Sequence, residues 1–447
     1  MRRSNKSSSG FRSITAFILV FVFFMCLMTV NSYWHNLLPA RQYIKTGDNI
    51  FAGMELPGMI KKNVSLHMHS SSNLLSIGGN NYQDLIIKPG SALPVAAKPG
   101  MLDLQFKLFG LIPIHHMLVD VVSPVKVIPG GQSIGVLLHS EGVMVVGEAA
   151  IDQGGKKIFP AREAGISVGD LILKLNGKEV TGENQLQNLI DKCGRQGKDV
   201  NLLVKHGNEV KNLRINPILC DETGRYRVGL FVKDSAAGVG TITFYDPDSR
   251  VYGALGHIIT DYSGKSIINP RDGKIVEASI KGLHPGKKGE PGEKLGVFKG
   301  KSDIIGDISK NTKYGIFGEL EKGLKNPIYG KPVAVALTYQ VKRGPAQILT
   351  VLDDNKIQSF DIEIAQVLPG NQSKGLVLQV TDPELIQRTG GIIQGMSGSP
   401  ILQDGKLVGA VTHVFINDPT RGYGVLAENM LKEANLINIE QLQKKAG

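Results

Sequence analysis

Residues 395–400 carry the stretch that constrains the fold most: Gly395-Met396-Ser397-Gly398-Ser399-Pro400, followed by the apolar pair Ile401-Leu402 and the turn Asp404-Gly405. Glycine accepts positive φ angles and lets another backbone approach closely, so a serine between two glycines indicates a tight turn. On such a turn the N–H groups of Gly395 and Ser397 can point at a developing oxyanion, where one donor contributes about 3 kcal/mol. The stretch therefore predicts a turn-rich β protein with Ser397 as a candidate nucleophile.

This loop resembles the nucleophile loop of chymotrypsin-like serine peptidases, in which the catalytic histidine precedes the aspartate and the aspartate precedes the serine. His257 and Ser397 obey that order. The resemblance implies a double β-barrel over residues 224–440, with His257 as the base. The orienting acid stays open between Asp382, 15 residues before Ser397, and Asp307, 50 residues after His257.

Two further residues beside this loop affect the expected chemistry. Met396 occupies the place of an acid in the digestive enzymes, so activation through a salt bridge to a new amino terminus is not predicted. His413 lies on the strand expected beside the substrate. It either shapes the primary pocket or packs structurally, and the sequence leaves both open.

Residues 126–218 resemble a PDZ domain. The resemblance rests on a short helix ending at Gly165, a turn at residues 168–170, an apolar strand from Leu171 to Leu175 and an Asn176-Gly177 hairpin turn. Asn and Gly tolerate the positive φ angles that such a turn requires. A helix over residues 185–193 follows, in which Leu186, Leu189 and Ile190 have the i, i+3, i+4 spacing of an apolar stripe.

PDZ domains bind a peptide as an added strand, and the backbone N–H groups of a short loop receive its carboxylate. By resemblance that loop covers residues 133–136, with Ile134, Gly135 and Val136 as the peptide-binding residues. A PDZ fold that only braces the chain is the alternative.

The amino terminus carries an export signal. Residues 1–13 are basic, and residues 14–30 form an uncharged run of 17 residues, at the lower limit for a spanning helix. No small-x-small cleavage site follows, which favours an uncleaved signal-anchor over a cleaved signal peptide or a buried core helix. The basic tail should stay cytoplasmic, which places the rest of the chain across the membrane. Residues 31–125 are expected to form a spacer with a small β region.

Length and composition set the remaining limits. The 447 residues suggest about three domains, and 54 glycines without a triplet repeat favour many short strands. The net charge of +11 comes from scattered Lys and Arg, which argues against nucleic-acid binding. No metal, nucleotide or redox motif occurs, so no cofactor is expected. Cys193 and Cys220 form either one disulfide or two buried thiols.

The anchor, a PDZ domain ahead of the peptidase, Gly256-His257 and residues 395–400 are together similar to the SpoIVB peptidase family of spore-forming Firmicutes. Similarity extends to residues 107–110, 129–136 and 409–414. The resemblance implies that Ser397, His257 and Asp382 form the catalytic triad. It also implies a peptidase made in the forespore and exported into the space between the forespore and mother-cell membranes. There it would cleave itself and a regulatory membrane protein, releasing a site-2-type protease that activates sigma factor K.

Two other functions fit parts of the sequence. A quality-control protease of the HtrA kind would degrade unfolded proteins, but its PDZ domain normally follows the peptidase. A catalytically inactive, membrane-anchored scaffold would keep only the PDZ function.

Overall fold

The computed structural model describes residues 38–54, 63–70, 72–88, 91–207, 209–260, 271–298, 303–368 and 373–437, and the single residues 17, 18, 21 and 25. The predicted anchor at residues 14–30 lies almost wholly outside this set. Within the described residues, no helix has both the length and the apolar character needed to cross a membrane. The anchor therefore stays a prediction.

The described residues from 38 to 125, with 337–340 and 437, form one compact unit. Its larger sheet has the strand order β1-β8-β7-β2-β5, and a smaller sheet has the order β4-β3-β6. The strands are β1 (Arg41–Lys45), β2 (Val64–Ser70), β3 (Leu75–Ile77), β4 (Asn80–Tyr82), β5 (Asp84–Ile87), β6 (Val95–Ala96), β7 (Gly100–Leu108) and β8 (Ile112–Val122). Alternate residues of β7, among them Leu104 and Phe106, are fully buried in a separate core. The expected spacer is therefore a domain of its own.

The second unit holds the rest of the chain and begins with a ring of six strands. In spatial order these are β10 (Ser133–Glu148), β19 (Leu230–Tyr245), β20 (Val251–Ala254), β26 (Gly315–Glu319), β24 (Ile304–Ile308) and β21 (Arg271–Glu277). A bridge between Gly306 and Leu320 joins β24 to the end of β26. The ring surrounds a core that includes Ile134, Ile242 and Tyr252. Short strands border it: β9 (Lys126–Pro129), β25 (Lys310–Thr312), β27 (Val333–Ala334), and the hairpin of β22 (Ser279–His284) and β23 (Glu293–Val297).

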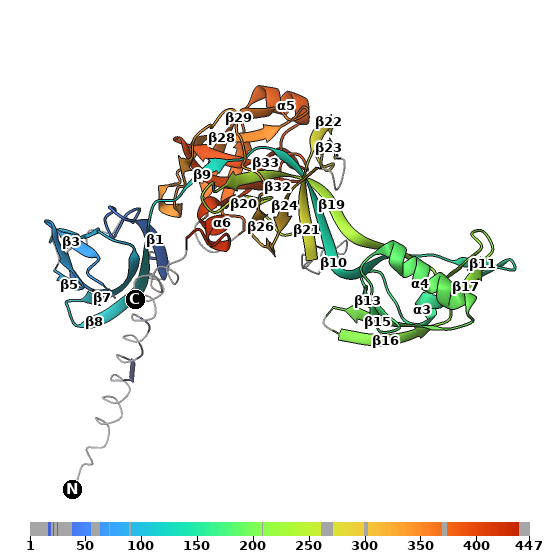
Figure 1. Cartoon of the computed structure of the whole chain (residues 1–447). Coiled ribbons are helices and arrows are strands. Elements are labelled where there is room, and N and C mark those ends of the chain that lie inside the picture. The colour runs from blue at the N-terminus through green and yellow to red at the C-terminus, as the bar shows by residue number, and fades with distance from the viewer. Residues whose placement is uncertain are drawn as a thin grey trace, which may run out of the picture. The chain divides into compact units, whose positions relative to one another are not determined.

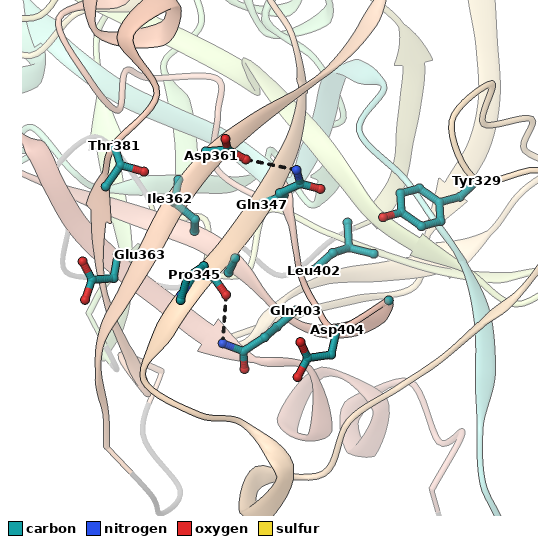
Figure 2. Close-up of a pocket in the computed structure, with 12 residues that line it drawn as sticks. Tyr329, Pro345, Gln347, Asp361, Ile362, Glu363, Thr381, Leu402, Gln403 and Asp404 are labelled. Carbon is teal, nitrogen blue, oxygen red and sulfur yellow. Dashed lines mark hydrogen bonds between the residues drawn. The ribbon is translucent and has the colours of Figure 1, made fainter.

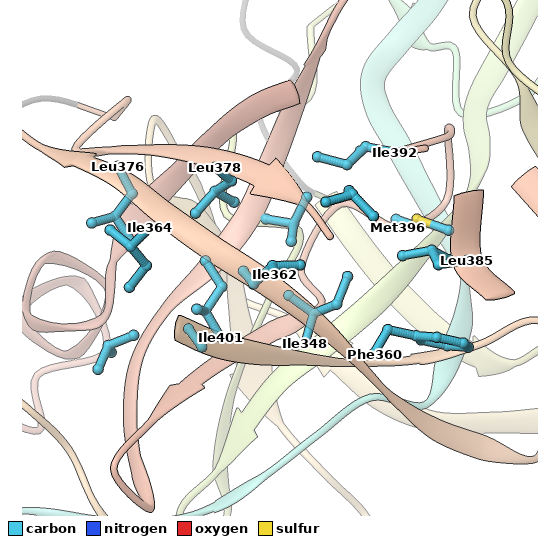
Figure 3. Close-up of a cluster of buried hydrophobic side chains, with 14 of the residues drawn as sticks. Ile348, Phe360, Ile362, Ile364, Leu376, Leu378, Leu385, Ile392, Met396 and Ile401 are labelled. Atoms are coloured by element: carbon cyan, nitrogen blue, oxygen red, sulfur yellow. The ribbon is translucent and has the colours of Figure 1, made fainter. Parts of the chain in front are cut away.

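A closed barrel of six strands follows. Its order is β28 (Gly344–Val351), β29 (Ile357–Val367), β30 (Leu376–Val380), β33 (Asp418–Leu426), β32 (Lys406–Phe415) and β31 (Pro400–Gln403). Helices α5 (Pro383–Thr389) and α6 (Ala427–Glu433) follow β30 and β33. Figure 3 shows how Phe360, Ile348 and Ile362 fill the barrel beside Met396 of the nucleophile loop. The mainly β prediction is confirmed.

The PDZ elements form where the sequence predicts them. Helix α3 (Pro160–Glu163) precedes Gly165, which has a φ of +88°, and strand β13 covers Leu171–Leu175. Asn176 and Gly177 have φ angles of +49° and +79°, as the hairpin turn requires. Helix α4 (Glu183–Arg195) buries Leu186 and Ile190. The remaining strands are β11 (Ile151–Gln153), β12 (Lys156–Ile158), β14 (Lys178–Glu179), β15 (Val200–His206), β16 (Glu209–Ile215), β17 (Ile218–Cys220) and β18 (Arg225–Arg227).

The PDZ domain is inserted between the first two strands of the six-stranded ring. Residues 134–139 of β10 pair with β19 and β21 in the ring, whereas residues 144–148 pair with the start of β19, beside the PDZ core. Figure 1 shows β10 and β19 leading out of the peptidase strands and into the part that contains α3 and α4. Strand pairing therefore crosses the predicted boundaries 126–218 and 224–440, because each domain takes strand segments from both sides of the insertion.

This pairing also corrects the predicted peptide-binding loop. Ile134 pairs with Gly240 on one side and with Glu277 on the other, and Gly135 and Val136 are held in the same way. Both edges of this segment are occupied, so it has no free N–H groups in a row to receive a peptide carboxylate.

The second barrel should depend on Phe360, which is 2% exposed. Phe360→Ala removes a buried aromatic ring from a close-packed core, so we expect the free energy of unfolding to fall by about 3–5 kcal/mol. Urea denaturation followed by far-ultraviolet circular dichroism measures the loss. Ile416→Ala is the control, because that side chain is 60% exposed and its removal should cost less than about 0.5 kcal/mol. Equal losses in the two variants would contradict this packing.

Candidate active site and peptide groove

The nucleophile loop has the backbone geometry that its glycines suggest. Gly395 and Gly398 have φ angles of +89° and +94°. A Cβ atom at position 398 would lie 2.0 Å from the carbonyl oxygen of Thr241, so a larger residue cannot occupy this position without moving the backbone. The loop is thus pressed directly against strand β19.

Two threonines of β19 hold the loop in place. The Thr241 hydroxyl donates to the carbonyl of Gly395 at 2.8 Å, and the Thr243 hydroxyl donates to the carbonyl of Gly398 at 2.8 Å. The Thr241 N–H also donates to the carbonyl of Ser397 at 3.0 Å. Both threonines are fully buried, where an unpaired carbonyl or hydroxyl would be costly. They are positioning residues that the sequence analysis missed, because nothing in the sequence relates position 241 to position 395.

The two amides predicted for the oxyanion hole are available in this loop. The N–H groups of Met396, Gly398 and Ser399 donate to the carbonyls of Ile393, Val411 and Met396. Those of Gly395 and Ser397 donate to no acceptor within the described part of the chain. A turn that leaves these two donors unused can offer both to a negatively charged oxygen.

Ser397 and His257 have separate partners in this structure. The Ser397 hydroxyl donates to the carbonyl of Thr412 at 2.7 Å. His257 Nδ1 lies 2.8 Å from the carbonyl of Ile258. A carbonyl only accepts, so Nδ1 carries the hydrogen and the lone pair of Nε2 is left to take a proton. Burial lowers the pKa of His257, and the hydrogen bond to the Ile258 carbonyl partly opposes this effect. The lowered pKa keeps the imidazole unprotonated at neutral pH, so Nε2 is free of a proton.

Neither candidate acid contacts His257. Asp382 is the N-cap of α5: its carboxylate accepts from the N–H of Leu385 at 3.0 Å and from the N–H of Asp361 at 3.2 Å. The Asp307 carboxylate accepts from the N–H of Glu319 at 2.7 Å. The structure thus brings His257 and Ser397 together but not Asp382. Within the described residues, a main-chain carbonyl holds the imidazole in the place expected for an acid.

Ser397 and His257 line one cavity of about 280 Å³, together with Gly395. Its walls are mostly apolar and include Val136, Val239 and Leu255. Val136, assigned from the sequence to the PDZ loop, therefore belongs to the active site. Sequence reasoning could not place Val136 and Val239 there, because the PDZ insertion separates them along the chain.

A larger cavity of about 440 Å³ lies elsewhere on the second barrel (Figure 2). It is lined by Pro345, Gln347 and Leu402, beside the carboxylates of Asp361 and Glu363, and Gln347 donates to Asp361 at 3.0 Å. Neither Ser397 nor His257 lines it, so it is not the peptidase site.

Two basic side chains flank the catalytic groups. The His413 ring lies 5.0 Å from the His257 ring, and partial burial together with His257 and Lys374 lowers the pKa of His413 to about 4. Lys294 is 4% exposed and donates to the Thr350 hydroxyl at 2.7 Å, and burial lowers its pKa to about 7. The Lys294 stem packs against Gly395, where an added Cβ would meet it at 3.1 Å. His413 is therefore uncharged at neutral pH. The Lys294 stem supports the nucleophile loop at Gly395.

The cysteines and acidic residues provide no further chemistry. Cys193 and Cys220 are free thiols, so the predicted alternative of a disulfide is wrong. No group of three or more His, Cys, Asp or Glu in the described residues has the arrangement of a metal site.

The PDZ domain has a groove, but not at the predicted loop. A cavity of about 260 Å³ lies between α4 and the start of β19, lined by Leu186, Ile190 and residues 228–232. One edge of residues 230–232 pairs with β10, and no described strand pairs with the other edge, beside α4. Gly229, with a φ of +80°, precedes this strand, and Arg225 and Arg227 line the same cavity. The groove strand thus follows the helix along the chain.

Comparison with known proteins finds a PDZ domain and a peptidase domain in this order along the chain. Residues 224–431 match the family described as SpoIVB peptidase S55, and residues 134–216 match the PDZ domain family. Neither match reflects the insertion: the peptidase match omits β10, and the PDZ match ends before β19.

Several solved structures resemble parts of the chain. The PDZ domain of an SdrC-like protein from Listeria monocytogenes is 22% identical, covers 21% of this chain and 87% of its own, with a TM-score of 0.17. The active form of the Rv3671c protease from M. tuberculosis is 13% identical, covering 45% and 74%, with a TM-score of 0.25. Human heparin binding protein is 10% identical, covering 44% and 84%, with a TM-score of 0.25.

The position of Asp382 makes a distinguishing prediction. Asp382→Asn keeps a side-chain oxygen that can cap α5, so we expect kcat/KM to stay within about threefold of wild type, whereas loss of a triad acid lowers kcat by about 10⁴-fold. Asp382→Ala should lower the free energy of unfolding by about 1 kcal/mol through loss of the cap. Steady-state hydrolysis of a peptide substrate and thermal unfolding measure the two effects. A drop of several orders of magnitude for the Asn variant, with unchanged unfolding, would make Asp382 the catalytic acid after all.

Proposed function

The chain is a SpoIVB-type PDZ-containing serine peptidase, and we propose that it cleaves its own chain and a regulatory membrane protein, using Ser397 as nucleophile and His257 as base. One observation carries the site assignment. Ser397, His257 and Gly395 face the same cavity, and the Gly395 and Ser397 amides are the unused donors of their loop. An inactive scaffold would need neither a neutral, buried imidazole nor a pair of unused amides beside a serine.

The geometry gives each group a step in acyl transfer. The Ser397 hydroxyl turns from the Thr412 carbonyl toward His257, and its oxygen attacks the scissile carbonyl carbon while Nε2 takes the proton. The amides of Gly395 and Ser397 bind the resulting oxyanion. Nε2 then gives the proton to the leaving amine, and water repeats the sequence on the acyl-enzyme. The Ile258 carbonyl keeps the imidazole tautomer fixed throughout.

The signalling role is the finer part of the proposal. The family match supports it, together with the basic tail and apolar run at the amino terminus. We place the peptidase in the space between the forespore and mother-cell membranes, either anchored by residues 14–30 or released. Cleavage of the regulator there would free a site-2-type protease, which would then activate sigma factor K. The PDZ insertion between β10 and β19 differs from the order expected of an HtrA-like quality-control protease, in which PDZ follows the peptidase.

Ser397→Ala tests the enzyme assignment. Removing the nucleophile should lower cleavage of the protein's own chain and of an added polypeptide by about 10³-fold or more. Mass spectrometry of purified wild type and variant reports both products and the fate of the amino terminus.

Ser399→Ala is the matched control, because Ser399 is two residues away in the same loop and fully buried. It should cleave at a rate close to that of wild type. Unchanged self-processing in the Ser397 variant would show that another residue, or another protein, makes the cut.

A second function, peptide binding, is favoured by the groove beside α4. The edge of residues 230–232 that faces α4 can accept a peptide as an added strand, and Leu186 and Ile190 offer an apolar wall for its side chains. The Gly229 amide and the two arginines are suited to a terminal carboxylate. We infer that the groove binds an apolar carboxyl-terminal peptide.

Gln187→Trp tests this groove, since Gln187 is exposed on α4 and lines the cavity. In protein that also carries Ser397→Ala, we expect the larger side chain to weaken binding of peptides with a free apolar carboxyl terminus by about tenfold or more. Fluorescence anisotropy with a peptide library and its amidated counterparts measures this. Lys192→Trp, exposed on α4 but outside the cavity, should have no effect. Equal binding of free and amidated peptides would contradict the carboxylate site.

A further inference from the structure

The β7–β8 hairpin ends in a tip of exposed apolar side chains. Phe109, Leu111 and Ile112 are 69%, 83% and 48% exposed. Their backbone is ordered by hydrogen bonds: the Phe109 N–H donates to the Asn63 carbonyl at 2.8 Å, and the Leu111 N–H donates to the Leu108 carbonyl at 3.1 Å. The tip is therefore a formed turn that presents large apolar groups outward, which soluble surfaces rarely gather in one place.

The charge around the tip has one sign. Between Asp103 and Asp120 the chain has no acidic residue, and Lys107 is the lysine in this interval. His116 pairs with the Asp103 carboxylate at 2.8 Å, and His115 is buried. An apolar tip with Lys107 behind it matches the interface of an anionic bilayer, where apolar groups enter the acyl region and cations stay at the headgroups.

The direction of the strands places this tip at the end of the sheet toward which the start of β1 points. Strand β8 starts at the tip, and β1 pairs with it in parallel, with Arg41 opposite Leu118. The start of β1, which leads back toward residue 30, therefore faces the same end of the sheet as the tip. Six residues of β8 separate Leu118 from Ile112, which is about 20 Å. Residues 31–40 can span about 35 Å when extended, so the end of the apolar run can reach the level of the tip.

We propose that the apolar tip, Phe109, Leu111 and Ile112, inserts into the surface of the same anionic bilayer that holds residues 14–30. The inference rests on the proposed membrane anchor. Two attachments, the anchor and the tip, fix the orientation of the first unit relative to the membrane plane, which a single attachment does not.

Tryptophan quenching in vesicles tests the insertion. The chain has one Trp, Trp34, so a protein carrying Trp34→Phe, Ser397→Ala and Leu111→Trp has a single reporter at the tip. The full chain is reconstituted in vesicles of phosphatidylcholine and phosphatidylglycerol in equal parts, with or without brominated acyl chains. We expect the tip reporter to lose most of its emission to the brominated chains. Phe109→Trp in the same background gives a second reporter.

The control reporter is Met101→Trp. Met101 lies at the opposite end of β7 and is 37% exposed, so its emission should be unaffected by the brominated chains. Trp34 in an otherwise wild-type Ser397→Ala protein reports the anchor separately. Quenching of Trp34 without quenching at positions 111 and 109 overturns the insertion and leaves the anchor standing. No quenching at any position overturns both, and equal quenching at 101 and 111 overturns a specific role for the tip.

Discussion

The contact between Gly398 and the Thr241 carbonyl is the constraint on which the active site depends. The loop lies so close to β19 that a Cβ atom at 398 would be 2.0 Å from that oxygen. This closeness lets the Thr241 and Thr243 hydroxyls bond the carbonyls of Gly395 and Gly398. Once those carbonyls are tied down, the amides of Gly395 and Ser397 are directed away from the loop's own acceptors. A strand of the first ring thereby shapes the oxyanion site carried by the second barrel.

The same strand also serves the PDZ domain. Residues 230–232 of β19 border the proposed peptide groove, and Thr241 and Thr243 hold the nucleophile loop. The proposed peptide groove and the support of the nucleophile loop thus share one continuous strand, because the PDZ domain is inserted into the ring and not appended to it. Each family match covers one continuous stretch of the chain, so each leaves out one strand segment of its domain. Only the strand pairing shows where the missing segments are.

The fate of the predicted site residues follows from how local their signals are. The loop turn, the Asn176-Gly177 hairpin and the stripe on α4 depend on neighbouring residues, and the structure forms all three. Asp382 was assigned from the family resemblance, but Asp-Pro at the end of a strand is also a strong start for a helix. The carboxylate caps α5, and both of its oxygens are occupied. Chain position alone could not separate these roles, because they differ only in which group lies within reach.

The sequence by itself determined the mainly β class and the PDZ elements, because backbone preferences and apolar periodicity act over a few residues. Its resemblance to a peptidase family indicated Ser397 with His257 as the candidate reactive pair. Tertiary structure alone decided which strands belong to each domain, the place of the proposed peptide groove and the partner of His257. It also decided that Thr241 and Thr243 hold the nucleophile loop. It also moved Val136 from a presumed peptide loop to the wall of the active-site cavity. Each of these depends on which strands pair across an insertion of about ninety residues, and pairing over that separation leaves no mark on local sequence.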